Sequence, residues 1–272
     1  MIQTIELYFL LFITYSVIGW TMEVVGKLIE LKRFVNRGFL IGPFCSIYGC
    51  GGILITLLLQ YFTANPVVLF FMAILVCGVL EYLTSYFMEK LFNARWWDYS
   101  QRKYNINGRV CLNTIIPFGI LGCLIMYVLN PFFLGLYGKI PTLYLHIVSG
   151  IILGIYVIDN IISLTVVLNI RKTTKAVNTE NREDNTEEIT KKVKEIILGK
   201  SSALNRRLVD AYPAIRFIKV KIKQKTKEIK KGVENTTREI KENIEDTKNN
   251  IKDSIEETKE NLKKLGKKDE NE

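Results

Sequence analysis

Two polar blocks interrupt long apolar stretches of this sequence, and their side chains could bind a substrate or a partner. The first begins NRGFLIGPFCSIYG at residue 36, and the second, MEKLFNARWWDYSQRKYNINGRVCL, covers residues 88–112. Ionisable groups inside apolar segments are costly, about 2.5–3.5 kcal/mol at the centre of a membrane span, and they usually face protein, water or a ligand. We predict substrate or partner contact for Glu23, Asn36, Arg37, Glu81, Trp97, Asp98, Asn107 and Arg109.

Each of these residues also has a structural interpretation. Trp97 lies at the edge of an apolar run, where tryptophan is typical of an anchor at the membrane interface. Glu81, in the middle of such a run, could serve a substrate pathway, a proton relay or a buried ion pair. The sequence leaves these alternatives open.

The residue types argue against catalysis by this chain alone. His146 is the single histidine, and no recognisable nucleophile accompanies a base. The five cysteines form no CxxC pair, so we expect neither a metal site nor disulfides. The nearest match to a phosphate-binding loop, KVKEIILGKSS, has Lys194 where the first glycine is required. We therefore expect no enzymatic activity and no cofactor.

Long uncharged runs must position these residues. No charge occurs in residues 38–80, a run of 43, or in residues 110–138, a run of 29. A helix needs roughly 20 apolar residues to cross hydrocarbon about 30 Å thick. The sequence predicts an all-α integral membrane bundle in residues 1–170, with five transmembrane helices at about 4–26, 39–62, 67–88, 111–137 and 143–170.

The charges predict the orientation of this bundle. Lys and Arg gather in the first and third connections between spans and after the fifth span, whereas the fourth connection has Lys139 alone and the second has none. Basic residues favour the cytoplasmic side. We predict a multi-pass cell-membrane protein with its N-terminus outside and its C-terminal tail in the cytoplasm.

Small residues predict helix packing at Gly42, Ser46, Gly49, Gly150 and Gly154. In lipid, helices associate where small side chains let their backbones approach closely. Glycine can instead support an unwound segment that lines a cavity, as in transporters with discontinuous helices. The spacing alone does not distinguish the two.

The C-terminal third is polar and charged. Residues 171–190 read as a flexible linker. Residues 191–272 predict an amphipathic helical tail, in which apolar residues recur every 11 positions from Ile218 to Leu262. Eleven residues fill about three turns, so these residues share one face, and the tail could lie on membrane lipid or form a coiled coil. Nucleic acid is a less suitable partner for a basic segment tethered beside a membrane.

Four sequence blocks together resemble a known family. They are IGWTME (18–23), NRGFLIGPFCSIYG (36–49), LEYLTSYFMEKLFNARWWDYS (80–100) and NINGRVCL (105–112), with Ser46 departing from the proline common in that family. The chain is similar to the bacterial membrane proteins described as putative type IV ABC-transporter permeases, the CmpB-like family.

The resemblance implies a permease-like component of an ABC-type transport system. Because this chain has no phosphate-binding loop, its ATPase would be a separate chain, and five spans would require a homo- or hetero-oligomer to form a pore. The alternative is a membrane scaffold or regulatory protein that acts through its cytoplasmic loops and tail.

Overall fold

The computed structural model describes residues 2–180, 186–200 and 202–217, together with 235–238, 240 and 248. The chain divides into two compact units, residues 1–219 and 220–272. Of the predicted 11-residue stripe, only Ile240 lies within the described residues, where it is helical. The stripe and the coiled coil therefore stay predictions.

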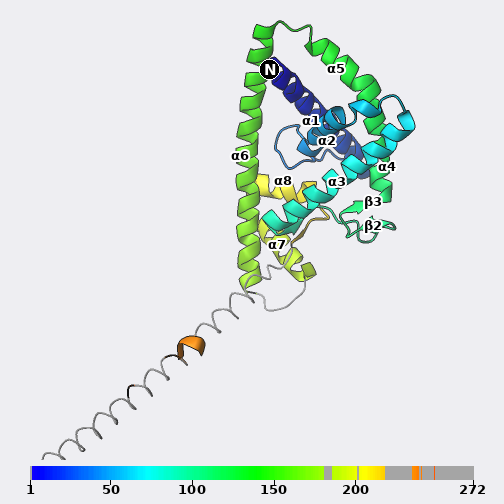
Figure 1. Ribbon diagram of the computed structural model, residues 1–272. Coiled ribbons are helices and arrows are strands. Elements are labelled where there is room, and N and C mark those ends of the chain that lie inside the picture. The colour runs from blue at the N-terminus through cyan, green and yellow to red at the C-terminus, as the bar shows by residue number, and fades with distance from the viewer. Residues whose placement is uncertain are drawn as a thin grey trace, which may run out of the picture. The chain divides into compact units, whose positions relative to one another are not determined.

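The first unit is mostly helical (Figure 1). Its helices are α1 (Ile2–Leu31), α2 (Ser46–Leu58), α3 (Pro66–Phe92), α4 (Leu112–Leu124), α5 (Asn130–Tyr137), α6 (Thr142–Glu180), α7 (Thr186–Lys200) and α8 (Ala203–Ala211), with a 3-10 turn η1 (Gln60–Phe62) and a π-helical turn η2 (Ile125–Leu129). Two small antiparallel sheets pair β1 (Ala94–Arg95) with β4 (Arg216–Phe217) and β2 (Asn105–Ile106) with β3 (Val110–Cys111).

Within the described residues, four helices are long and apolar enough to cross a membrane. They cover Ile2–Leu31, Pro66–Phe92, Leu112–Tyr137 and Thr142–Val177. These four correspond to the predicted spans 4–26, 67–88, 111–137 and 143–170. In Figure 1, α6 lies along one edge of the bundle and α4 lies on the opposite side of α1.

The predicted span at 39–62 is not confirmed. Its helix, α2, covers only Ser46–Leu58, which are 13 residues. At 1.5 Å per residue α2 is about 20 Å long, shorter than the hydrocarbon it would have to cross. The turn after α2 lies against the middle of the Leu112–Tyr137 helix, where Tyr127 donates a hydrogen bond of 2.8 Å to the carbonyl of Thr63.

Glycines bring α1 and α2 into close contact. A Cβ at Gly49 would lie 2.2 Å from Oγ of Ser16, and a Cβ at Gly52 would lie 2.2 Å from the ring of Tyr15. Both distances are far below van der Waals contact, so only glycine fits at these two positions. The backbones of α1 and α2 therefore pack directly on one another.

The other predicted packing residues have different positions. Gly42 lies in the loop before α2 and not on a helix. Ser46, the first residue of α2, shares a hydrogen bond of 2.9 Å with the hydroxyl of Tyr156 in α6. A Cβ at Gly150 or Gly154 would meet nothing within 4 Å, so this GxxxG pair makes no close contact among the described residues.

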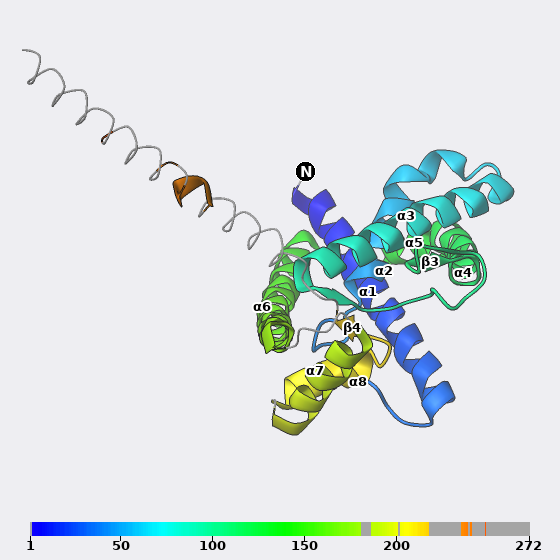
Figure 2. The ribbon, with the colours of Figure 1, turned by 90° about the horizontal axis from the view of Figure 1, so that it is seen from below.

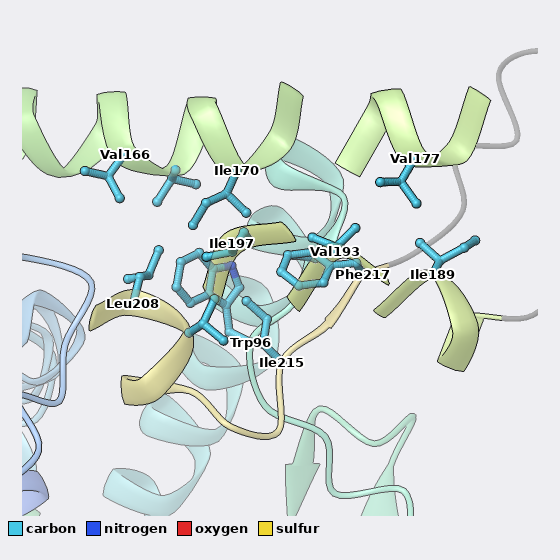
Figure 3. Close-up of a cluster of buried hydrophobic side chains, with 13 residues drawn as sticks. Trp96, Val166, Ile170, Val177, Ile189, Val193, Ile197, Leu208, Ile215 and Phe217 are labelled. Atoms are coloured by element: carbon cyan, nitrogen blue, oxygen red, sulfur yellow. The ribbon is translucent and has the colours of Figure 1, made fainter. Parts of the chain in front are cut away.

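At one end of the bundle, α7, α8 and β4 build an apolar cluster against α6 and loop three (residues 93–111). Figure 3 shows Val166, Ile170 and Val177 of α6 directed toward this cluster, and Figure 2 shows α7 and α8 from the same end. Its fully buried members include Ile197 and Phe217. Residues 171–190, predicted as a flexible linker, are helical up to residue 180 and again from residue 186.

Candidate functional site

The loop at residues 36–45 is irregular backbone that runs beside apolar helices. Buried amide groups need hydrogen-bond partners, and non-helical backbone in such surroundings is tolerated only where protein or water supplies them. Asp159 of α6 accepts hydrogen bonds of 2.8 Å from the amides of both Ile41 and Gly42. Arg207 of α8 donates to the carbonyls of Leu40 at 2.9 Å and Phe39 at 3.3 Å. Side chains from two distant helices therefore fix this loop.

Asn36 stabilises the same loop from within. Its side-chain nitrogen donates to the carbonyl of Ile41 at 2.7 Å, and its oxygen accepts from the indole of Trp20 at 2.8 Å. Both ends of the amide group are occupied. Asn36 is therefore a positioning residue for the loop and not one of the side chains that line the cavity described next.

Arg37, Gly38 and Cys45 of the loop line a cavity of about 430 Å³ among α1, α2, α3 and α4. Side chains from loop three and Tyr212, which follows α8, also line this cavity. Its wall is mostly apolar, as is typical of small-molecule sites, which commonly occupy 300–1,000 Å³. Of the eight predicted contact residues, the cavity is lined by Glu23, Arg37, Glu81 and Trp97.

Glu23 has partners for both carboxylate oxygens. It accepts a hydrogen bond of 2.9 Å from the hydroxyl of Tyr48 and forms an ion pair of 3.3 Å with Arg37. Arg37 also donates to the carbonyl of Ala211 and lies 5.0 Å from the ring centroid of Tyr212. Burial raises the pKa of Tyr212, so its phenol stays neutral beside this arginine.

Glu81 is satisfied on one oxygen only. It is 7% exposed, and Oε1 accepts a hydrogen bond of 3.2 Å from the hydroxyl of Tyr99. Burial raises the pKa of Tyr99 and the neighbouring Glu81 raises it further, so the phenol keeps the proton that it donates. Among the described residues, Oε2 of Glu81 has no hydrogen-bond partner. Glu81 therefore lines the cavity and carries a buried acceptor that no group of the described residues uses.

A second polar cluster, the loop-three network, lies beside the cavity. Glu89 of α3 forms ion pairs of 2.9 Å with both Arg95 and Arg109. Arg109 is 7% exposed, lies between the rings of Tyr82 and Tyr86 at 5.7 and 5.4 Å, and thereby fixes loop three to α3. The predicted site residue Arg109 belongs to this network and not to the cavity.

Asp98 joins loop three to the segment after α8. Its oxygens lie 3.7 Å from Arg95 and 2.8 Å from Arg216, and it accepts from the amide of Ser100 at 2.9 Å. Burial would raise the pKa of Asp98, but the hydrogen bonds from Ser100 and the two arginines outweigh it and hold the pKa below its usual value. Asp98 is therefore an anionic connector between β1 and β4.

Asn107 is a turn residue. It has a φ of 53° and the next residue, Gly108, a φ of 68°, as an Asn-Gly turn between antiparallel strands requires. Its side chain donates to the hydroxyl of Tyr82 at 3.0 Å, on the exposed side of loop three. Asn107 shapes the β2–β3 hairpin and does not line the cavity.

Sequence reasoning missed the tyrosines of the cavity, Tyr48, Tyr99 and Tyr212, and the loop-fixing Arg207. Tyr99 could have been proposed, because it directly follows Asp98 in the block already singled out. Tyr48 lies in an apolar run where tyrosine carries no special signal. Arg207 and Tyr212 lie in residues 191–272, predicted as an amphipathic helical tail, so their contacts with residues 37–40 could not be read from the sequence.

Comparison with known proteins identifies one family. A family described as "Putative ABC-transporter type IV" matches the chain over residues 10–164. No curated protein and no solved structure matches the chain. The matched range contains the loop at 36–45, loop three and both cavity carboxylates, whereas α7, α8 and β4 follow it.

Proposed function

Because the chain belongs to the putative type IV ABC-transporter family, we propose that it is the transmembrane, permease-like component of an ABC-type transport system whose ATPase is a separate chain. One observation carries the proposal. A cavity of about 430 Å³ lies among apolar helices, and a buried carboxylate with an unused oxygen lines it. Polar groups of this kind inside a membrane module mark a substrate pathway more often than a purely structural site.

The arrangement of charges supports the predicted orientation. Loop one (residues 32–45) and loop three contact the same segment after α7: Arg33 pairs with Asp210 at 2.7 Å, and β1 pairs with β4. These basic loops therefore belong to one end of the bundle, which we assign to the cytoplasm by the positive-inside rule. The N-terminus is then outside, and membrane lipid surrounds the exposed apolar faces of the four long helices.

Partner subunits are part of the proposal. The cavity has a limited volume of about 430 Å³ and is lined by parts of α1, α2, α3 and α4, so transport would need a second copy or another membrane chain to complete a path. An ATPase would dock on the cytoplasmic end, where loop three exposes Lys103 and Tyr104 beside the β2–β3 hairpin.

Crosslinking in native membranes tests this assignment. An amine-reactive crosslinker applied to membranes that contain the tagged chain should join Lys103 to a subunit with a phosphate-binding loop, identified by mass spectrometry. A Lys103→Arg variant is the matched control, because it keeps the charge and should lose that crosslink only. Isolation of the chain without any ATPase, together with unchanged substrate fluxes in a deletion strain, would contradict the proposal.

A second candidate is a membrane scaffold or regulatory protein. It is favoured by the folded layer of α7, α8 and β4, which fixes the loop at 36–45 and covers part of loop three. The two candidate functions predict opposite responses to two changes in the chain. A transporter component should lose function on Glu81→Gln, whereas a scaffold should tolerate that change and fail when residues 218–272 are removed.

A further inference from the structure

We propose that the cavity binds an organic monocation with an apolar body, and that Glu81 is its counter-ion. This inference rests on the proposed function only in treating the cavity as the substrate site. It adds the chemical class of the ligand, and it is tested by binding alone. Three features of the cavity lead to it: its net charge, its hydrogen-bonding groups and the composition of its wall.

The charges of the cavity leave one carboxylate uncompensated. Glu23 and Arg37 pair with one another, so together they contribute no net charge. Two arginines of loop three, Arg95 and Arg109, both pair with Glu89. Glu81 forms no ion pair among the described residues. An unpaired buried carboxylate is costly, and a positive ligand in the cavity would supply the missing partner.

Three hydrogen-bond donors of the wall already have partners within the protein. Tyr48 donates to Glu23, Tyr99 donates to Glu81, and the indole of Trp97 donates to the carbonyl of Arg109 at 3.0 Å. These three donors are occupied. Oε2 of Glu81 is an unused acceptor.

The helix α4 adds a second acceptor. Pro117 lies inside this helix and has no N–H, so the carbonyl of Asn113 lacks the donor that position 117 would normally provide. Both residues line the cavity. A positively charged ligand matches these oxygens, whereas an anion would be repelled by the carboxylate of Glu81.

The rest of the wall suits an apolar body. Aromatic residues of the lining include Tyr48, Trp97, Tyr99 and Phe118, and aliphatic side chains of α2, α3 and α4 complete it. Aromatic faces attract cations by about 0.5–2 kcal/mol while also packing against apolar groups. The volume of about 430 Å³ admits a small amphiphilic amine.

The test compares three probes of nearly the same shape. They are benzyltrimethylammonium, its neutral carbon analogue neopentylbenzene, and the anion phenylmethanesulfonate. Each is titrated against the full-length chain in nanodiscs of zwitterionic phosphatidylcholine, with empty nanodiscs subtracted, and binding is read by saturation-transfer NMR. We expect the cation to bind at least tenfold more tightly than the neutral analogue and the anion to bind weakest.

Two variants assign that preference to Glu81. Glu81→Gln should reduce the preference for the cation at least tenfold while leaving the affinity for neopentylbenzene unchanged, and Glu81→Asp should keep it. The control is Glu6→Gln, because Glu6 is also a carboxylate of a membrane helix but pairs with His146 outside the cavity.

The wild-type titrations remain decisive even where a variant does not fold. Equal or tighter binding of the neutral or anionic probe overturns the inference, as does a preference for the cation that persists in Glu81→Gln. The assay needs no ATPase and no flux. Cation binding without an ATPase partner would therefore contradict the proposed transporter and leave the ligand class intact, whereas an ATPase partner with binding of the anion would do the reverse.

Discussion

The cavity and the loop-three network contain the same types of residue, but these residues have different partners in the two regions. In the network, Glu89 meets two arginines at 2.9 Å, and Asp98 is held by Ser100, Arg95 and Arg216. In the cavity, Glu81 receives one hydrogen bond from a tyrosine and leaves an oxygen without a partner. Eight residues separate Glu81 from Glu89 on one helix. A carboxylate that is paired with arginines stabilises a fold, whereas a carboxylate without a cationic partner is available to a ligand.

Of the changes predicted here, breaking the loop-three network should lower the free energy of unfolding most. Arg109→Met removes a buried guanidinium and leaves Glu89 with one arginine, so we expect a loss of about 3 kcal/mol in the free energy of unfolding. The measurement is reversible unfolding of the full chain in mixed micelles, followed by tryptophan fluorescence. Arg33→Met is the control: its pair with Asp210 is about half exposed and should contribute less than about 1 kcal/mol. Equal losses in the two variants would contradict the distinction.

The same substitution at the two glutamates sharpens the comparison. Glu89→Gln weakens two charge-assisted hydrogen bonds and should cost about 2 kcal/mol in the same unfolding assay. Glu81→Gln keeps an acceptor for Tyr99 and removes a buried charge without a cationic partner. We expect it to leave the free energy of unfolding unchanged or to raise it by up to about 1 kcal/mol. A larger loss at Glu81 than at Glu89 would show that Glu81 is a structural residue.

Two adjacent glycines of the cavity wall, Gly51 and Gly52, differ in how closely their neighbours pack against them. A Cβ at Gly52 would lie 2.2 Å from the ring of Tyr15, whereas a Cβ at Gly51 would meet Leu80 at an ordinary 3.6 Å. Gly52→Ala should therefore destabilise the chain by about 1–3 kcal/mol through overpacking. Gly51→Ala should be neutral or stabilising by up to about 1 kcal/mol, because alanine favours helix. Thermal unfolding of the pair checks this, and similar midpoints would argue against direct contact of α1 and α2.

The smallest expected effect is the acid sensitivity of Asp98. Its pKa in the folded chain is below the ordinary value of 3.8, so its ion pairs stabilise the fold above about pH 4. That contribution should disappear as the pH falls through the lower pKa of the folded state. Near-UV circular dichroism of Trp96 and Trp97 follows the acid transition. We expect this transition at a lower pH in the wild type than in Asp98→Asn, where it should come at a higher pH or lose its cooperativity. Identical acid transitions would show that Asp98 does not couple β1 to β4.

Four of the five spans could be predicted because long uncharged runs have few alternatives to membrane helices. The stretch 39–62 looked equally apolar, yet residues 38–45 form a loop, because Asp159 and Arg207 supply the hydrogen bonds that a helix would otherwise provide. Those partners are more than 100 residues away in the sequence. Composition records how apolar a segment is and does not record which distant side chain satisfies its backbone.

The candidate site, too, could be predicted only in part from the sequence. Glu23 and Glu81 stand out because charges are rare in apolar runs, and both line the cavity. Asp98, Asn107 and Arg109 stand out as members of a polar block between apolar runs, yet they build loop three. Spacing along the chain could not separate these groups, because the pairing of Glu89 with Arg109 depends on how loop three folds back onto α3.

The cluster around Trp96 has a consequence for biogenesis. Trp96 is 3% exposed because Tyr212 packs edge-on against it at 5.0 Å and β4 pairs with the adjacent β1. Its cover is synthesised about 120 residues later, which takes roughly 6–24 s at 5–20 residues per second. During that interval the nascent chain holds an inserted loop three with an uncovered tryptophan. A chain that ends before Tyr212 would therefore leave this face of Trp96 without its cover.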